Sequence, residues 1–438
     1  MKKIKPILLI FLSLIIYIYV CSIEFLPNNI ILFQGENLNV TTLLGIQVKT
    51  TNNVNGLIGD IEYNAMQTST SSTEEKSNKI GNANISLELF GKIPLKQIDV
   101  NIIPKTKVIP IGKSVGLRLY TQGVLVVGMS EIKGQDNTKY KPYENSGIEE
   151  GDTIIAVNND KISNTAELIE SVNKSNGSSV AVKYIKDENN SVVTTSITPV
   201  KTSENEYKLG LWVRDAAEGV GTITFYEPST GQFAALGHPI TDVDTGNIIN
   251  ISNGELITSN ILSITKGTKG RPGEIRGIIS KGSKIGEIAM NTSFGIFGNV
   301  THSNNLKSYL DSILNIEFGT NSESINIEEG IDVALRSEIK EGKAHILCEL
   351  ENGKIERFEI QIQKIYAGNN YDNKSMLIKV TDQRLIEKTG GIIQGMSGSP
   401  IIQNNKFVGA VTHVLVSDPT QGYAVFGDLM IKEMREVK

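Results

Sequence analysis

The C-terminal half of this 438-residue chain is a succession of short β-type runs that alternate with glycine-containing turns. The clearest of these runs are 221–226, 274–279, 345–350, 357–362 and 407–411. Helical signals are few, and the best of them is at 306–314. Because many short strands joined by turns are typical of barrels and sandwiches, we predict a mostly β domain over 206–438.

A second β-rich unit is predicted over 105–200. Strands are predicted at 116–119, 123–127 and 180–184. A loop that continues into a further strand is predicted at 146–159. Ser163 and Asn164 can cap a helix that precedes the last strand, with an apolar face that includes Leu168 and Val172.

This order of elements resembles the PDZ domain, and the stretch SGIEEGDTIIAVNN at 146–159 carries most of the resemblance. PDZ domains bind an extended peptide as an added strand. The resemblance implies that the peptide-binding edge lies around Gly116, Leu117 and Leu119, with Leu168 and Val172 lining the groove. A role for these apolar side chains in the core alone is the competing interpretation.

The N-terminus predicts a membrane anchor over residues 1–23. Lys2, Lys3 and Lys5 precede an apolar run, and no small-residue cleavage site follows it. The lysines favour a cytosolic N-terminus, so the rest of the chain is expected beyond the membrane. Residues 24–104 are predicted as an extracytoplasmic region with a polar linker at 51–80 and a strand from Ala83.

Composition excludes several classes of function. The net charge of −5 gives no reason to expect a nucleic-acid partner. Cys21 and Cys348 are the only cysteines, so neither a disulfide framework nor a cysteine zinc site is predicted. No metal or other cofactor is expected.

The sharpest chemical signal is the motif GMSGSP at 395–400. A nucleophilic serine needs a tight turn, nearby backbone N–H groups and a base within reach. The motif predicts Ser397 as the nucleophile, with the N–H groups of Gly395 and Ser397 forming an oxyanion hole. Its G-x-S-G-[SG]-P pattern is that of chymotrypsin-like peptidases, and Ser399 departs from the elbow of α/β-hydrolases.

Four histidines could supply the general base: His238, His302, His345 and His413. His238 is favoured because it ends an apolar run, within AALGHPITD, upstream of the serine motif. His413 follows the strand after the serine loop and is predicted to line a substrate pocket. The residues alone leave Asp242 and Asp382 both open as the acid that would orient His238.

The pair AALGHPITD and GGIIQGMSGSP, after a PDZ unit and an N-terminal span, resembles the stage IV sporulation protein B peptidase family. The resemblance implies a chymotrypsin-like double β-barrel, with His238, Ser397 and Asp382 in the catalytic roles. It also implies a regulatory endopeptidase between the two membranes around the forespore. Such a peptidase cleaves itself and the extracytoplasmic part of a membrane signalling complex, which activates a late mother-cell sigma factor.

Two other functions remain open. A catalytically inactive scaffold would retain the PDZ unit and its peptide partner but lose cleavage. An esterase acting on small molecules would need an active site like this one, but the β-rich pattern and the missing nucleophile elbow argue against it.

Overall fold

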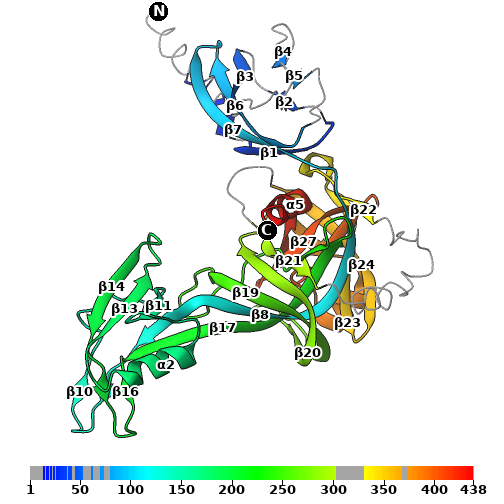
Figure 1. The fold of residues 1–438 in the computed structure, drawn as a ribbon. Coiled ribbons are helices and arrows are strands. Elements are labelled where there is room, and N and C mark those ends of the chain that lie inside the picture. Colours follow the sequence, from blue (N-terminus) through cyan, green and yellow to red (C-terminus); the bar gives the residue numbers. More distant parts are fainter. Residues whose placement is uncertain are drawn as a thin grey trace, which may run out of the picture.

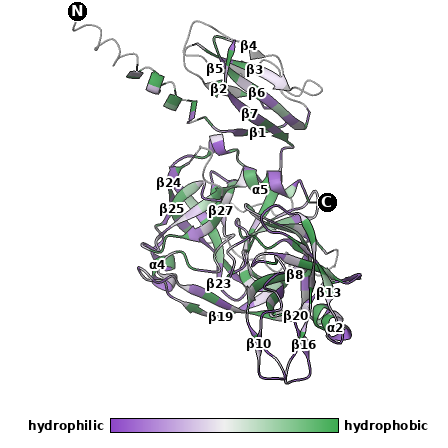
Figure 2. Cartoon of the chain, turned by 90° about the vertical axis from the view of Figure 1, so that its left-hand side faces the viewer, coloured by the Kyte–Doolittle hydropathy of each residue, from purple (hydrophilic) through white to green (hydrophobic). Residues whose placement is uncertain are grey.

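The computed structural model describes residues 13–437 apart from 15, 19, 22, 25, 37, 42–44, 53–60, 63–69, 74–78, 302–329 and 367–372. The described chain is mostly β, and it forms two barrels, a PDZ-like unit and an N-terminal sheet. The N-terminal sheet lies at one end of the molecule and the PDZ-like unit at the other (Figures 1 and 2).

The first barrel is a ring in which each strand pairs with its neighbours. Its strands are β8 (Lys107–Met129), β17 (Leu211–Glu227), β18 (Gln232–Ala235), β21 (Gly295–Val300), β20 (Glu274–Thr292) and β19 (Ile251–Thr265). A pairing of β19 with β8 closes the ring. Its fully buried aromatic residues include Phe225, Phe233 and Phe297, which belong to a core shared with the second barrel. Phe225 packs edge-on against Phe407 of that barrel, at 5.1 Å between ring centroids.

The second barrel is closed in the order β23-β24-β25-β28-β27-β26. The strands are β23 (Gly342–Glu351), β24 (Lys354–Ile365), β25 (Met376–Val380), β28 (Gln421–Phe426), β27 (Lys406–Val414) and β26 (Pro400–Gln403). The short helix α4 (Gln383–Thr389) follows β25, and α5 (Gly427–Met434) follows β28. The mostly β, double-barrel prediction is therefore confirmed in its architecture.

The PDZ-like unit is carried on a long two-stranded ribbon of β8 and β17. Beyond the barrel it contains β11 (Thr153–Val157), α2 (Thr165–Lys174), β13 (Val180–Ile185) and β14 (Val192–Ile197). Short pairs complete it: β9 (Ile132–Lys133) with β10 (Lys139–Tyr140), β12 (Asp160–Lys161) with β11, and β15 (Val200–Lys201) with β16 (Tyr207–Lys208). The Asn164 side chain accepts a hydrogen bond from the Glu167 N–H at 2.9 Å, which confirms the predicted helix cap.

The two strands predicted at 116–119 and 123–127 are one strand, β8. Its first part pairs with β17 and β19 inside the first barrel, and only its last part, from about Gly123, pairs with β11 of the PDZ-like unit. The PDZ-like unit is thus an insertion between two strands of the first barrel. The sequence boundary near residue 200 does not separate two independently paired units.

The N-terminal region has a core of its own. The strands β1 (Asn29–Phe33), β7 (Ile93–Ile103), β6 (Gly81–Leu89) and β3 (Ile46–Asn52) form one sheet. A smaller sheet joins β2 (Asn39–Thr41), β5 (Thr70–Thr73) and β4 (Ile61–Glu62), so the predicted linker at 51–80 includes short strands. Apolar alternation of the kind seen from Ala83 onward buries Ile85 and Leu87 in this core (Figure 2).

Three predictions concern segments that lie wholly or mostly outside the described residues. In the described part of the chain, no helix is long and apolar enough to cross a membrane. Most of the predicted anchor over 1–23, the predicted helix at 306–314 and His302 lie outside the described residues. Near the second barrel, the short β22 (Ile331–Asp332) pairs with β8, and η2 (Arg336–Glu338) follows it.

Candidate active site

The serine loop runs from the end of α4 to the start of β26, and it turns on glycines. Gly395 and Gly398 both have φ +97°, a conformation that side-chain-bearing residues rarely adopt. A Cβ on Gly398 would lie 2.2 Å from the Thr222 carbonyl oxygen. The loop therefore requires glycine on both sides of Ser397, and it packs directly against β17 of the other barrel.

Thr222 holds the serine loop in place from the first barrel. Its N–H donates to the Ser397 carbonyl at 3.1 Å, and its Oγ1 donates to the Gly395 carbonyl at 2.7 Å. Because both carbonyls are turned toward β17, the N–H groups that flank them are directed elsewhere.

The N–H groups of Gly395 and Ser397, on either side of Met396, are available to bind an anion. The N–H groups of Met396 and Gly398 donate to the carbonyls of Ile393 and Val411, at 3.1 and 2.7 Å. Those of Gly395 and Ser397 have no hydrogen-bond partner among the described residues. Both residues are partly exposed, so these two N–H groups are accessible and are the candidates for the predicted oxyanion hole.

The hydroxyl of Ser397 is already engaged in this arrangement. Its Oγ donates to the backbone carbonyl of Thr412, on β27, at 2.7 Å. A hydroxyl has one proton to donate, so a rotation about its Cα–Cβ bond has to precede transfer of that proton to a base. Rotation of this kind takes picoseconds to nanoseconds in accessible side chains.

His238 lies directly after β18, on a turn with positive φ at Leu236 and Gly237. Its Nδ1 lies 2.7 Å from the carbonyl oxygen of Pro239. Because a carbonyl oxygen only accepts, this contact places the proton on Nδ1 and leaves the lone pair on Nε2. A general base needs that tautomer, which is assigned here from the hydrogen bond.

His413 lies beside His238. Their ring centroids are 5.0 Å apart with an interplanar angle of 37°, and the buried Nδ1 of His413 has no partner in the described chain. Thr412, the acceptor of the Ser397 hydroxyl, is its neighbour on β27. The structure therefore brings together Ser397, His238 and His413, which come from both barrels.

Both imidazoles are held in the neutral form. Burial lowers the pKa of His238, and the Pro239 carbonyl opposes this only in part. Burial, the ring of His238 and the charge of Lys374 lower the pKa of His413 to about 4. Two adjacent neutral rings, rather than a cation and a carboxylate, form the resting site.

We predict that the acidic limb of the pH profile of kcat/KM lies below pH 6.5. The folded-state pKa of His238 is lowered, so the base stays unprotonated and active to lower pH than a free histidine would. Activity should be lost only as pH falls through that lowered value. A limb above pH 6.5 would contradict the prediction, because it would mean that a carboxylate stabilises the His238 cation.

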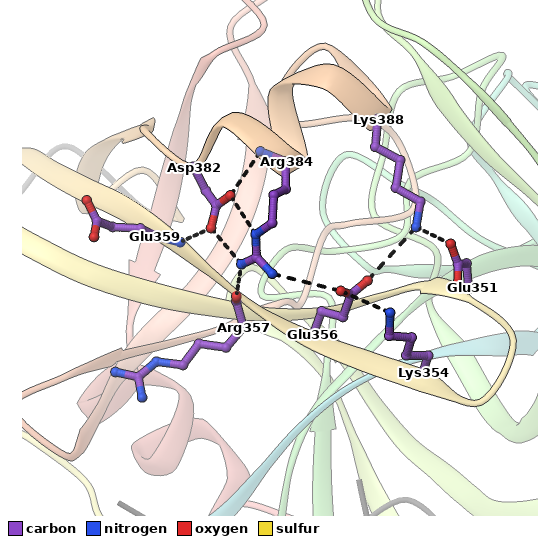
Figure 3. A network of polar contacts seen from close by, with 8 residues as sticks. All are labelled: Glu351, Lys354, Glu356, Arg357, Glu359, Asp382, Arg384 and Lys388. Atoms are coloured by element: carbon purple, nitrogen blue, oxygen red, sulfur yellow. Dashed lines mark hydrogen bonds and ion pairs between the residues drawn. The ribbon is translucent and has the colours of Figure 1, made fainter. Parts of the chain in front are cut away.

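Asp382, the acid implied by the family resemblance, serves a different set of partners (Figure 3). It is the N-cap of α4, where Oδ1 accepts from the Arg384 N–H at 3.0 Å and Oδ2 accepts from the Arg384 Nη2 at 2.8 Å. The Glu359 N–H also donates to Oδ2, at 3.3 Å. Although burial opposes the change, these Arg384 and backbone contacts hold the pKa of Asp382 below its ordinary value.

The second acid left open by the sequence, Asp242, is equally occupied. Its Oδ1 accepts from the N–H groups of Asp244 and Thr245, each at 3.0 Å, and its Oδ2 pairs with Arg214. Among the described residues, no carboxylate lies within hydrogen-bond or ion-pair reach of His238. The group that orients the imidazole is the backbone carbonyl of Pro239.

We predict that Asp382→Asn retains peptidase activity within about tenfold of wild type. Asparagine is as good an N-cap as aspartate, so α4 and the serine loop after it should keep their positions. Asp382→Ala removes the cap and should lower the free energy of unfolding by about 1 kcal/mol. A loss of kcat near 10⁴-fold in the asparagine variant, as for a triad aspartate, would show instead that Asp382 reaches His238.

The strand that was predicted to bind a peptide in the PDZ-like unit does not line its groove. Gly116, Leu117 and Leu119 lie in the first barrel, where β17 pairs along one edge of β8 and β19 along the other. Leu117 and Leu119 are 1% and 0% exposed. No peptide can add as a strand there, because β8 runs on through the barrel and has no free edge at these residues.

A groove does form beside α2. A cavity of ≈ 610 Å³ is lined by Leu168 and Val172, as predicted, and by residues 209–213, which lead into β17 and form its start. In this part, β17 pairs with β8 along one edge, and α2 lies along its other edge. The missed signal was the run LGLWV at 209–213, in which Gly210 has φ +79° immediately before the strand.

Comparison with known proteins identifies the family of this chain and its PDZ domain. The family model described as SpoIVB peptidase S55 matches residues 205–431, just over half of the chain, and a PDZ domain model matches residues 116–197. No curated protein sequence matches the chain.

Solved structures similar to this chain include proteins of both kinds. The Rv3671c protease of Mycobacterium tuberculosis, in its active form, shares 13% identity over 50% of this chain and 74% of its own, with a TM-score of 0.24. The PDZ domain of the SdrC-like protein of Listeria monocytogenes shares 16% identity over 21% of this chain and 87% of its own, with a TM-score of 0.16. Because these TM-scores are low, the two solved structures are not used to assign the family. The assignment rests on the two family models. The chain belongs to the SpoIVB peptidase S55 family and is a serine peptidase that carries a PDZ domain.

Proposed function

We propose that Ser397 is the nucleophile and His238 the general base of a regulatory endopeptidase. The observation that carries the proposal is the pair of N–H groups without partners among the described residues at Gly395 and Ser397, on a loop whose Ser397 hydroxyl is bonded to Thr412. Thr412 precedes His413, and the His413 ring lies 5.0 Å from that of His238. Rotation of Ser397 from the Thr412 carbonyl toward Nε2 of His238 would allow proton transfer as the hydroxyl attacks a peptide carbonyl. The two N–H groups would then stabilise the oxyanion.

Substrate binding can assist this rotation. The Thr412 carbonyl, which holds the Ser397 hydroxyl, is on β27, next to the site. An extended peptide that donates its own N–H to this carbonyl would displace the hydroxyl and direct it toward His238. The net stabilisation lost by the hydroxyl is that of one hydrogen bond, about 1 kcal/mol, which a bound peptide readily offsets.

The proposed biological role is cleavage of proteins outside the cytosol during sporulation. Support comes from the family match, from the lysine-led apolar segment at 1–23 and from the PDZ groove, which suits capture of an extended peptide. In this role the anchored protein lies in the space between the two forespore membranes. There it cleaves itself and an extracytoplasmic segment of a membrane complex, and thereby activates a late mother-cell sigma factor.

Covalent labelling of the full-length protein in detergent tests the chemistry. A fluorophosphonate probe should modify Ser397 at neutral pH, and peptide mapping would identify the residue. A folded protein that never reacts would instead favour a scaffold that binds peptides without cleaving them.

A further inference from the structure

A second cavity adjoins the serine loop on the side of the first barrel. It has a volume of ≈ 620 Å³ and is lined by Val220, Leu262, residues 274–277, Gln394 and Gly395. Gly395 supplies one of the two free N–H groups beside Ser397. The cavity therefore opens directly next to the place where a peptide carbonyl would react.

The strand β20 forms one side of this cavity and is tied to the serine loop. The Ile275 N–H donates to the Gln394 carbonyl at 2.8 Å, and the Gln394 N–H donates to the Gly273 carbonyl at 2.9 Å. A Cβ on Gly395 would lie 2.9 Å from the Cβ of Ile275. Motion of the loop relative to β20 is thus restricted, so the cavity keeps a fixed position relative to Ser397.

The cavity is open and its lining is mixed: Val220, Leu262 and Ile275 are apolar, whereas Glu274, Arg276 and Gln394 are polar. Leu262 is 63% exposed, and a Cβ on Gly277 would lie 3.4 Å from Val220, so any side chain at Gly277 would project against the cavity wall. Glu274 and Arg276, at the rim, form an ion pair at 2.9 Å. Because these two charges neutralise each other, the site has little attraction for a charged group, whereas an apolar group would cover Leu262.

The edge of β20 offers a track for a peptide backbone. Over 274–279, β20 pairs with β19 on one side, and among the described residues only the bridge of Glu274 to Gln394 occupies the other. Gly395 lines the cavity and lies two positions before Ser397, so the two are at most about 7 Å apart along the chain. An extended peptide advances about 3.3 Å per residue, so one or two residues span that length. Thr412 and His413 lie against the serine from the other barrel.

We propose that this cavity is a substrate subsite that selects a bulky aliphatic side chain, one or two residues from the scissile bond on the β20 side. The inference rests on the proposed function, because it assumes that Ser397 cleaves extended peptides. It assigns the selection to Val220 and Leu262, and it assigns the room for the side chain to the absence of a side chain at Gly277.

Cleavage of a peptide library by the full-length protein in detergent tests the subsite, with cut sites read by mass spectrometry. Wild type should prefer valine, isoleucine, leucine or methionine at one position near the cut, by about tenfold over glycine or alanine. Gly277→Val fills the cavity without requiring a positive φ, and it should reverse this preference toward glycine and alanine. Leu262→Ser should reduce the preference by about tenfold, with little change for peptides that have glycine there.

Ile278→Ser is the matched control, because Ile278 is an exposed aliphatic residue of β20 that does not line the cavity. Cleavage with an unchanged preference in both Gly277→Val and Leu262→Ser would overturn the subsite and leave the proposed function intact. A change in Ile278→Ser equal to that in Leu262→Ser would also overturn it. Absence of any cleavage by wild type would instead overturn the proposed function, and the subsite with it.

Discussion

Ser397→Ala should lower kcat for peptide cleavage by about 10⁴- to 10⁶-fold and abolish labelling by a fluorophosphonate probe. The change removes the hydroxyl that is bonded to Thr412, the residue before His413, on the loop that carries the Gly395 N–H. A residual rate above that of water is expected, since the oxyanion hole and the binding groove remain. The measurement is single-turnover cleavage of a peptide or of the protein's own chain.

Loss of activity has to be separated from loss of folding. The Ser397 hydroxyl makes one hydrogen bond, to Thr412, so its removal should change the free energy of unfolding by about 1 kcal/mol or less. Thermal unfolding of the variant should therefore stay cooperative and close to that of wild type.

Ser399 is the matched control for this variant. It lies two positions further along the same motif, is 0% exposed, and its Oγ has no partner among the described residues. Ser399→Ala removes a buried polar atom without breaking a hydrogen bond, so it should leave both activity and stability near wild type. Equal loss of activity in the two alanine variants would point to damage of the loop and would contradict a nucleophilic role for Ser397.

The local chemistry of the site could be predicted from the sequence because its signals are local. Flanking glycines announce a turn with positive φ, and the structure has φ +97° at both Gly395 and Gly398. The run before His238 ends at a comparable turn. Such patterns fix the backbone over a few residues, and this is enough to locate a loop that can present a hydroxyl or an imidazole.

The sequence could not predict which strands pair with one another when they are distant in the chain. The segment 116–119 has the pattern of an edge strand, yet β17 and β19 cover both of its edges. Pairing of strands that lie more than a hundred residues apart leaves no local trace. The strand side of the PDZ groove was therefore predicted in the wrong place. The helix side, α2, was predicted correctly from its cap and its apolar face.

The group that orients His238 could not be predicted from the sequence for another reason. The group is the backbone carbonyl of Pro239, and every residue has such a carbonyl, so no residue type indicates it. The family resemblance instead indicated a carboxylate, that of Asp382. The partners of Asp382 explain its place in the chain without catalysis: it caps α4 and pairs with Arg384 (Figure 3). A helix that leads into the serine loop benefits from such a cap whether or not the acid touches the base.

His238→Gln should lower kcat by about 10⁴-fold or more, and a second change at Ser397 should add almost nothing. Glutamine keeps a polar side chain of similar size but cannot take up the serine proton at neutral pH. If one imidazole and one hydroxyl act as a unit, removing both costs about as much as removing one. The double variant His238→Gln/Ser397→Ala should then have the rate of the slower single variant.

His345→Gln is the control, since this histidine lies on β23 of the second barrel and its Nδ1 contacts Arg357 at 2.9 Å. It should retain activity within a factor of a few. Losses from His238 and Ser397 that multiplied in the double variant would mean that the two residues act independently. Losses that did not multiply would mean that the two residues act as a unit, although the serine loop leads into the second barrel and His238 follows a strand of the first.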